Sequence, residues 1–289
     1  MHQIVLKMRS KQLMQKPEIC ILLPETPVGQ PHSPCKALWL LHGGTCDFED
    51  YLYRTRITSM LHRPDLMVII PNGLNSDFAN HMEFANGYPY ADFFFDELMP
   101  FIYTNFNVSA RPADNYLAGY SMGGAASLMY ALYRPGAFAQ VGVLGSSVRE
   151  SAFLRPYLEL TGAEFKKLAF ADPKKLPTEF GDPAYGITRK EINMIGRYDT
   201  VRDYVDSMEC TWERFTDAAK DGRVPNLLFC CGDQDGCCEK VLEFRDYAGS
   251  LGVTGVRFEI VPGYGHDRED VPILRALELM GLTSEDVTR

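Results

Sequence analysis

One serine lies in a sequence context that favours nucleophilic chemistry. The segment Gly119-Tyr120-Ser121-Met122-Gly123-Gly124 matches G-x-S-x-G, and no other serine in the chain does. An apolar run precedes the motif, and a segment with helical spacing follows it as far as Arg134. Strand, sharp turn and helix form a nucleophile elbow, whose glycines permit a strained backbone that exposes the serine hydroxyl. The pattern predicts Ser121 as a nucleophile; a glycine-rich turn without chemistry is the less favoured interpretation.

A serine hydroxyl needs a general base at neutral pH. In a nucleophile elbow the chain order is serine, then acid, then histidine. Of the six histidines, only His266 follows Ser121, and it lies in a loop directly after an apolar run that ends at Val261. Elimination therefore predicts His266 as the base. His42 precedes the serine, so we expect it to support its loop structurally.

Two aspartates could be the acid that orients this histidine. Asp233 and Asp235 follow the apolar run at 227–231, and no other acid between the serine and the histidine is placed in this way. Either carboxylate could hold the imidazole and stabilise its charged form. The residues alone do not separate the two. We expect the other aspartate to cap the helix predicted at about residues 239–247.

Two backbone amides are candidates for stabilising a developing oxyanion. One comes from the residue after the nucleophile, which is Met122. The other is expected from the loop His42-Gly43-Gly44-Thr45, with Gly44 as the preferred donor. The start of the helix after Ser121 adds a favourable dipole.

Short apolar runs alternate with helical segments along the chain. This alternation predicts an α/β fold with a mostly parallel sheet and helices on both faces. An antiparallel pair is expected at residues 3–8 and 18–23. The other predicted strands lie at residues 37–41, 66–70, 116–119, 140–144, 227–231 and 256–261.

Two segments stand outside this regular alternation. Apolar residues at helical spacing predict a helix at about 94–106, with Pro100 in its first turn or at a kink. Residues 148–223 contain several prolines, and helical spacing is found there only at about 204–215. We therefore expect this segment to be a cap-like insertion. The whole chain, residues 1–289, is expected to form a single domain. We expect this insertion to lie over the carboxyl edge of the sheet and roof a pocket. Candidate wall residues, equally consistent with core positions, are Tyr88, Tyr90, Phe93, Phe94 and Phe95.

Composition restricts the possible partners. The 289 residues carry a formal net charge of −9, which disfavours nucleic acids and anionic membrane surfaces. No secretory signal or spanning segment is recognisable, so we expect a cytoplasmic protein. The eight cysteines lack C-x-x-C spacing, so we expect reduced thiols and no metal site. A small ester substrate is the expected partner, with homo-oligomers possible and no metal or organic cofactor required.

Four segments together carry a family resemblance: Leu40-Leu41-His42-Gly43-Gly44, the elbow at 119–124, Cys231-Gly232-Asp233-Gln234-Asp235 and the loop at 263–266. Over about residues 1–280 the chain resembles the putative esterase family of α/β-hydrolases. That family includes tributyrin esterases, S-formylglutathione hydrolases and feruloyl or acetyl-xylan esterases, and the bacterial tributyrin-esterase branch is the most similar. The resemblance implies an α/β-hydrolase fold and assigns the acid to Asp235, the aspartate that ends a C-G-x-x-D stretch.

The expected function is that of a serine carboxylesterase acting on short-chain acyl esters through Ser121, His266 and Asp235. Thr45-Cys46 resembles a loop of S-formylglutathione hydrolases, so thioester cleavage remains an alternative, as do feruloyl or acetyl-xylan ester hydrolysis and acyl transfer. A catalytically silent binding module is the alternative outside enzymes.

Overall fold

The computed structural model describes residues 1–25, 33–81, 88–171, 189–266 and 270–284. The chain forms two compact units, one of Met1–Val148 with Ala218–Arg289 and the other of Arg149–Asp217. The second unit falls within the insertion expected at 148–223, and the placement of that insertion over the sheet stays a prediction. Part of it, residues 172–188, lies outside the described residues, as does Asp267 of the histidine loop.

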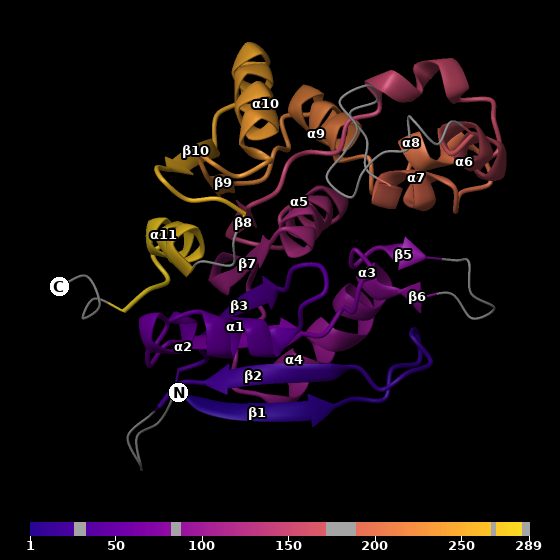
Figure 1. The fold of residues 1–289 in the computed structure, drawn as a ribbon. Coiled ribbons are helices and arrows are strands. Elements are labelled where there is room, and N and C mark those ends of the chain that lie inside the picture. Colours follow the sequence, from indigo (N-terminus) through magenta and orange to yellow (C-terminus); the bar gives the residue numbers. More distant parts are fainter. Residues whose placement is uncertain (26–32, 82–87, 172–188, 267–269, 285–289) are drawn as a thin grey trace. The chain divides into compact units, whose positions relative to one another are not determined.

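A mixed sheet forms the centre of the larger unit (Figure 1). In the described part of the chain its strands follow the order β1-β2-β4-β3-β7-β8-β9-β10. β2 is antiparallel to β1 and β4, and the remaining neighbours are parallel. The predicted α/β-hydrolase fold is confirmed. The strands are β1 (His2–Lys7), β2 (Glu18–Leu23), β3 (Lys36–Leu41), β4 (Leu66–Pro71), β7 (Asn115–Tyr120), β8 (Gln140–Leu144), β9 (Leu227–Gly232) and β10 (Val256–Val261).

The central strands are apolar because both of their faces are covered. Every residue of β4 and of β8 is buried. Leu40 and Val68 share a core cluster with Ile273 and Leu277 of a helix that the sequence did not predict. The helices of this unit, apart from the 90–105 segment, are α1 (Phe48–Arg54), α2 (Ile57–Met60), α5 (Met122–Tyr133), α10 (Cys238–Ser250) and α11 (Asp270–Leu279), with a 3₁₀ turn at Pro112–Asp114.

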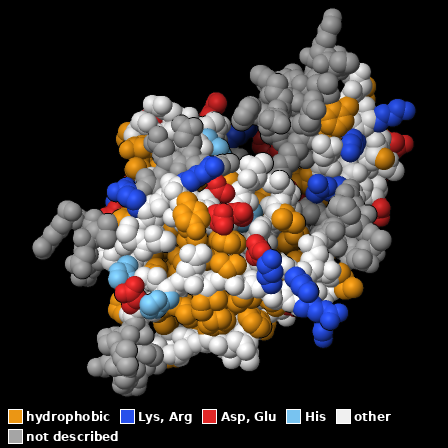
Figure 2. All heavy atoms as spheres, turned by 60° about the horizontal axis from the view of Figure 1, so that its bottom comes forward, with side chains coloured by type: hydrophobic (Ala, Val, Ile, Leu, Met, Phe, Trp, Pro, Cys, Tyr) orange, Lys and Arg blue, Asp and Glu red, His pale blue; other side chains and the backbone are white. Residues whose placement is uncertain are grey.

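The edge strand β1 differs from the central strands because it lies largely in solvent. Ile4 and Val5 are 37% and 46% exposed, and Lys7 forms an ion pair with Glu18 of β2 at 2.8 Å. Figure 2, which brings this side of the molecule forward, shows hydrophobic side chains exposed between charged groups. None of the described helices is both long and apolar enough to span a membrane.

The helix predicted at about 94–106 is divided into three parts: α3 (Tyr90–Asp92), a π-helical turn η1 (Phe93–Leu98) and α4 (Met99–Asn105). Pro100 lacks an N–H group and would clash with a carbonyl one turn earlier. It lies in the first turn of α4, directly after the wider π turn. A short ribbon, β5 (Asn80–His81) with β6 (Tyr88–Pro89), precedes this segment.

The aromatic side chains near this segment belong to the core. Tyr90, Phe93 and Phe94 are buried, and Phe95 packs on Tyr130 with ring centroids 5.1 Å apart. Tyr90, Phe93 and Phe94 therefore occupy core positions, which the sequence allowed as the alternative, and the half-buried Phe95 packs beside them. The side chain of Tyr88 lies outside the described residues.

The smaller unit contains more helix than the sequence predicted. The expected helix at 204–215 is two helices, α8 (Val201–Val205) and α9 (Thr211–Lys220), since the backbone turns at 206–210. The 3₁₀ segment η3 (Ala152–Tyr157), α6 (Gly162–Ala169) and α7 (Arg189–Ile195) were missed because short helices give few apolar repeats. Both α6 and α8 begin with a capping box, at Thr161 and Thr200, which is a readable sequence signal.

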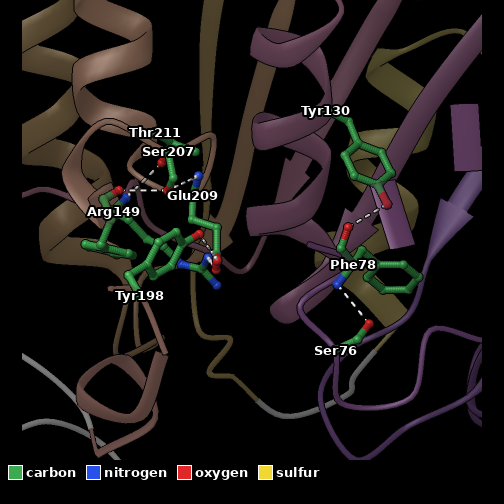
Figure 3. Close-up of polar contacts among 9 residues, drawn as sticks. Ser76, Phe78, Tyr130, Arg149, Tyr198, Ser207, Glu209 and Thr211 are labelled. Carbon is green, nitrogen blue, oxygen red and sulfur yellow. Dashed lines mark hydrogen bonds and ion pairs between the residues drawn. The ribbon is translucent and has the colours of Figure 1, made fainter. Parts of the chain in front are cut away.

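A buried ion pair joins distant parts of this smaller unit (Figure 3). Nη1 of Arg149 lies 3.3 Å from Oε2 of Glu209, a side chain with no exposed surface. The hydroxyl of Tyr198 donates to Glu209 at 2.7 Å, and the amide of Arg149 donates to the Thr211 hydroxyl at 3.0 Å. These bonds satisfy the buried carboxylate and tie the start of the unit to the segment before α9.

Candidate active site

Ser121 occupies a sharp turn between β7 and α5. Its backbone has φ +55° and ψ −114°, a left-handed conformation that is costly for a residue with a side chain. Two hydrogen bonds hold it there: its amide donates to the Leu144 carbonyl at 2.8 Å, and its carbonyl accepts from the Ala125 amide at 3.0 Å. This geometry matches the nucleophile elbow that the sequence predicted.

Two glycines of the motif allow the close packing that this turn requires. A Cβ atom on Gly119 would lie 2.3 Å from the Gly123 carbonyl oxygen, and one on Gly123 would lie 2.1 Å from the Leu41 carbonyl oxygen. Contacts this short are forbidden for a side chain. The glycines therefore bring the start of α5 against the end of β3, so that Ser121 borders the loop at Gly43.

The structure brings the three side chains selected from the sequence into one hydrogen-bonded row. Nε2 of His266 lies 3.0 Å from Oγ of Ser121, and Nδ1 lies 2.9 and 3.0 Å from the two carboxylate oxygens of Asp235. Because the carboxylate only accepts, Nδ1 carries the proton and Nε2 presents its lone pair to the serine. This arrangement can remove the hydroxyl proton as the oxygen attacks a carbonyl carbon.

The Asp235 carboxylate is held in its charged form. Burial alone would raise the pKa of this group, which is 6% exposed. Hydrogen bonds from His266 and from the Cys237 amide, at 2.9 Å, outweigh the burial and lower the pKa below its ordinary value. Asp235 is therefore ionised at neutral pH and can stabilise a protonated imidazole.

Asp233 has a different position from the one that the sequence predicted. Its carboxylate does not cap α10, whose N-cap residue, Cys237, makes no side-chain cap bond. Instead Oδ1 of Asp233 accepts from the Gly263 amide at 2.7 Å, and the Asp233 amide donates to the Val261 carbonyl at 3.1 Å. Asp233 thus ties the acid loop to the histidine loop, a tertiary contact that helix-capping rules do not reveal.

The Met122 and Gly44 amides border the serine. Met122 is the first residue of α5, where the N–H group has no partner within the helix. Neither amide donates a hydrogen bond to another residue in the described part of the chain. A Cβ atom on Gly44 would lie 4.0 Å from Cβ of Met122, so the two residues are neighbours. Their amides stay the candidate donors for an oxyanion.

His42 is a fully buried residue that braces two loops. Its Nδ1 lies 2.8 Å from the Gly43 carbonyl, and its Nε2 accepts from the Gly73 amide at 2.9 Å. Nδ1 must therefore carry the proton, and the ring is neutral. This is the structural position expected from the sequence.

Burial of His42 predicts a loss of stability in mild acid. Desolvation lowers its pKa below the ordinary 6.5, although the Gly43 carbonyl, Asp47, Asp50 and Asn72 act in the opposite direction. A lowered folded-state pKa means that stability is present above pH 6.5 and is lost as pH falls towards the folded-state value, because the unfolded chain binds the proton first. Between pH 7.5 and pH 5.5, the protonation of His42 in the unfolded chain should lower the free energy of unfolding by up to about 1.4 kcal/mol.

Urea unfolding at the two pH values measures this loss directly. Over the same pH interval, the free energy of unfolding of the His42→Gln variant should fall by about 1 kcal/mol less than that of the wild type. Leu251→Ala, at an exposed side chain without an ionisable group, serves as the control and should keep the wild-type difference. An equal pH dependence in the His42→Gln and wild-type proteins would contradict the prediction.

Sequence reasoning missed two residues next to this site. Tyr120 stacks on the His266 ring with centroids 5.2 Å apart and an interplanar angle of 26°. Asn75, from the loop after β4, accepts from the Thr45 amide at 2.6 Å. Tyr120 could have been noted as the residue before the nucleophile, whereas Asn75 has no recognisable sequence signal.

The cysteines are all free thiols. Cys237 interacts with Cys231 and with Asp235, and the hydrogen bond with Cys231 together with burial raises the pKa of the Cys237 thiol. No group of three or more candidate metal-ligating side chains is present within the described ranges.

Comparisons with known proteins give a consistent result. A family model described as "Putative esterase" matches residues 10–222. An acetyl esterase from Caldicellulosiruptor saccharolyticus is 23% identical over 251 residues, which cover 86% of this chain and 85% of that protein.

Two solved structures from Staphylococcus aureus are similar over nearly the whole chain. The substrate-bound fluorophosphonate-binding serine hydrolase FphF is 28% identical with a TM-score of 0.74, covering 96% of this chain and 98% of that one. The S-formylglutathione hydrolase FrmB is 26% identical with a TM-score of 0.71 and the same coverage.

Proposed function

The chain belongs to the putative esterase family and is a serine-type carboxylic ester hydrolase, and we propose that it cleaves short-chain acyl esters through an acyl-serine intermediate at Ser121. The observation that carries this proposal is the hydrogen-bonded row from Ser121 through His266 to Asp235.

The proposed reaction has two halves. Oγ of Ser121 attacks the ester carbonyl while Nε2 of His266 takes the hydroxyl proton, and the Met122 and Gly44 amides hold the oxyanion. The tetrahedral intermediate collapses, the C–O bond to the alcohol breaks, and the imidazolium returns its proton to the departing alkoxide. Water then attacks the acyl-serine with the same imidazole as base, which releases the carboxylic acid and restores Ser121. Asp235 keeps the imidazole in the required tautomer throughout.

A short acyl group is favoured because one relative of the chain is an acetyl esterase, and acetyl is a short acyl group. Thioester cleavage is the second candidate, because FrmB is an S-formylglutathione hydrolase and because Thr45-Cys46 resembles a loop of such enzymes. Both reactions pass through an acyl-serine and differ in the leaving group.

Parallel kinetics on p-nitrophenyl acetate, p-nitrophenyl butyrate, p-nitrophenyl octanoate, methyl ferulate and S-formylglutathione test this proposal. We expect kcat/KM to be highest for the acetate or the butyrate, with a decrease of about tenfold or more for the octanoate, since a pocket matched to a short chain excludes a longer one. Higher kcat/KM values for methyl ferulate or S-formylglutathione would contradict the short-chain assignment and favour the corresponding alternative.

A further inference from the structure

We propose that Asn75 is a positioning residue for the oxyanion-binding amide of Gly44, an inference that rests on the proposed function. Oδ1 of Asn75 accepts from the Thr45 amide at 2.6 Å and would lie 3.8 Å from a Cβ atom on Gly44. Asn75 therefore contacts the loop at Gly44 and Thr45, and it leaves the Gly44 N–H available to a substrate.

Gly44 lies between two peptide groups that are both held in place. On its N-terminal side, the Gly43 carbonyl accepts from Nδ1 of His42 at 2.8 Å. Because a peptide group is planar and trans, fixing that carbonyl also fixes the direction of the Gly44 N–H. On its C-terminal side, Asn75 holds the Thr45 N–H. Because glycine has wide backbone freedom, holding the peptide groups on both sides of Gly44 narrows the range of directions that its N–H can take.

The bond to Asn75 also holds Thr45 in a strained backbone conformation. Thr45 has φ +60°, a left-handed conformation that costs a β-branched residue of order 1–3 kcal/mol. Such a residue relaxes when its restraints are removed. Loss of the Asn75 acceptor should therefore let Thr45 move and widen the range of directions open to the Gly44 amide.

The loop that carries Asn75 is anchored to the helix that starts at the nucleophile. The hydroxyl of Tyr130 on α5 donates to the Phe78 carbonyl at 2.7 Å, and the Phe78 amide donates to the Ser76 hydroxyl at 3.1 Å (Figure 3). At the other end of the loop, the Gly73 amide donates to His42. Thus α5 presents the Met122 amide directly and, through this loop, braces the Gly44 amide.

The consequence is an effect on the transition state and little effect on substrate binding. Removing one oxyanion donor costs about 10²–10³ in kcat in a comparable site. Asn75→Ala leaves the Gly44 donor present but loosely held, so we expect kcat to fall about 10- to 100-fold with KM nearly unchanged.

The test compares Asn75→Ala and Asn75→Leu with Leu74→Ala, a control in the same loop at a side chain that is 55% exposed. Two further readouts distinguish positioning from general damage. The inhibition constant of a trifluoromethyl ketone, whose hemiketal anion occupies the oxyanion site, should rise in proportion to the loss of kcat/KM. The midpoint of the pH profile of kcat/KM, set by the acid and base groups, should stay at its wild-type value.

Three results would overturn the proposal: a kcat within about threefold of wild type in both Asn75 variants, an equal loss in Leu74→Ala, or a shifted pH midpoint with unchanged inhibitor binding. Ser121→Ala is assayed in parallel to separate the two hypotheses. If Ser121→Ala is active, the proposed function is wrong; if it is inactive while the Asn75 variants are fully active, only the positioning role is wrong.

Discussion

Replacing Ser121 with alanine is expected to lower kcat for p-nitrophenyl acetate by about 10⁴- to 10⁶-fold, because no other group supplies the attacking oxygen. Residual hydrolysis would come from the oxyanion site and from substrate binding. The thermal midpoint should change little, since alanine meets the same left-handed strain at φ +55° as serine does. Initial rates at saturating substrate measure the effect.

Ser127→Ala is the matched control for this experiment. Ser127 lies on α5 as well, and its hydroxyl donates to the Gly123 carbonyl within the helix. Its loss should change kcat by less than about threefold. If Ser121→Ala retained most of the activity, the alternative of a catalytically silent binding module would gain support, with the measured hydrolysis coming from elsewhere.

The second large effect is expected at Asp235. Asp235→Asn should lower kcat by about 10⁴-fold, because an amide in this position donates to Nδ1 and so favours the wrong imidazole tautomer. The backbone need not move, since the amide is nearly isosteric with the carboxylate. Circular dichroism and the thermal midpoint verify folding, and kcat at saturating ester gives the effect.

Asp233→Asn provides a control two positions away in the sequence. The Asp233 carboxylate accepts from the Gly263 amide, and an asparagine oxygen can accept the same bond. We therefore expect a loss of less than about tenfold. A larger effect at Asp233 than at Asp235 would contradict the assignment of the acid.

Much of the sheet could be predicted because its strands are buried on both faces and therefore read as unbroken apolar runs. The bounds of β8 and β10 agree with the predicted ranges, and those of β4 and β9 differ by one residue. The division of the 90–105 segment could not be predicted, because the apolar spacing continues through the π turn. The ion pair of Arg149 and Glu209 could not be predicted either, because the two residues lie 60 positions apart in the sequence.

For the candidate site, the G-x-S-x-G motif in its strand-to-helix context selected Ser121, chain order selected His266, and family resemblance selected Asp235. The structure brings these side chains together, while their catalytic roles stay predictions. The positions of Asp233 and Asn75 were not predictable in this way. Each depends on a loop-to-loop contact across about thirty residues, which leaves no local pattern.

The proposed mechanism requires the hydroxyl of Ser121 to carry the acyl group during turnover. Mass spectrometry of the protein quenched shortly after mixing with p-nitrophenyl acetate, followed by peptide mapping, tests it most directly. We expect one acetyl group on the peptide that contains Ser121, and none on the Ser121→Ala variant. An acetyl group on another nucleophile, such as the nearby Cys46 thiol, with Ser121 unmodified during active turnover, would contradict it.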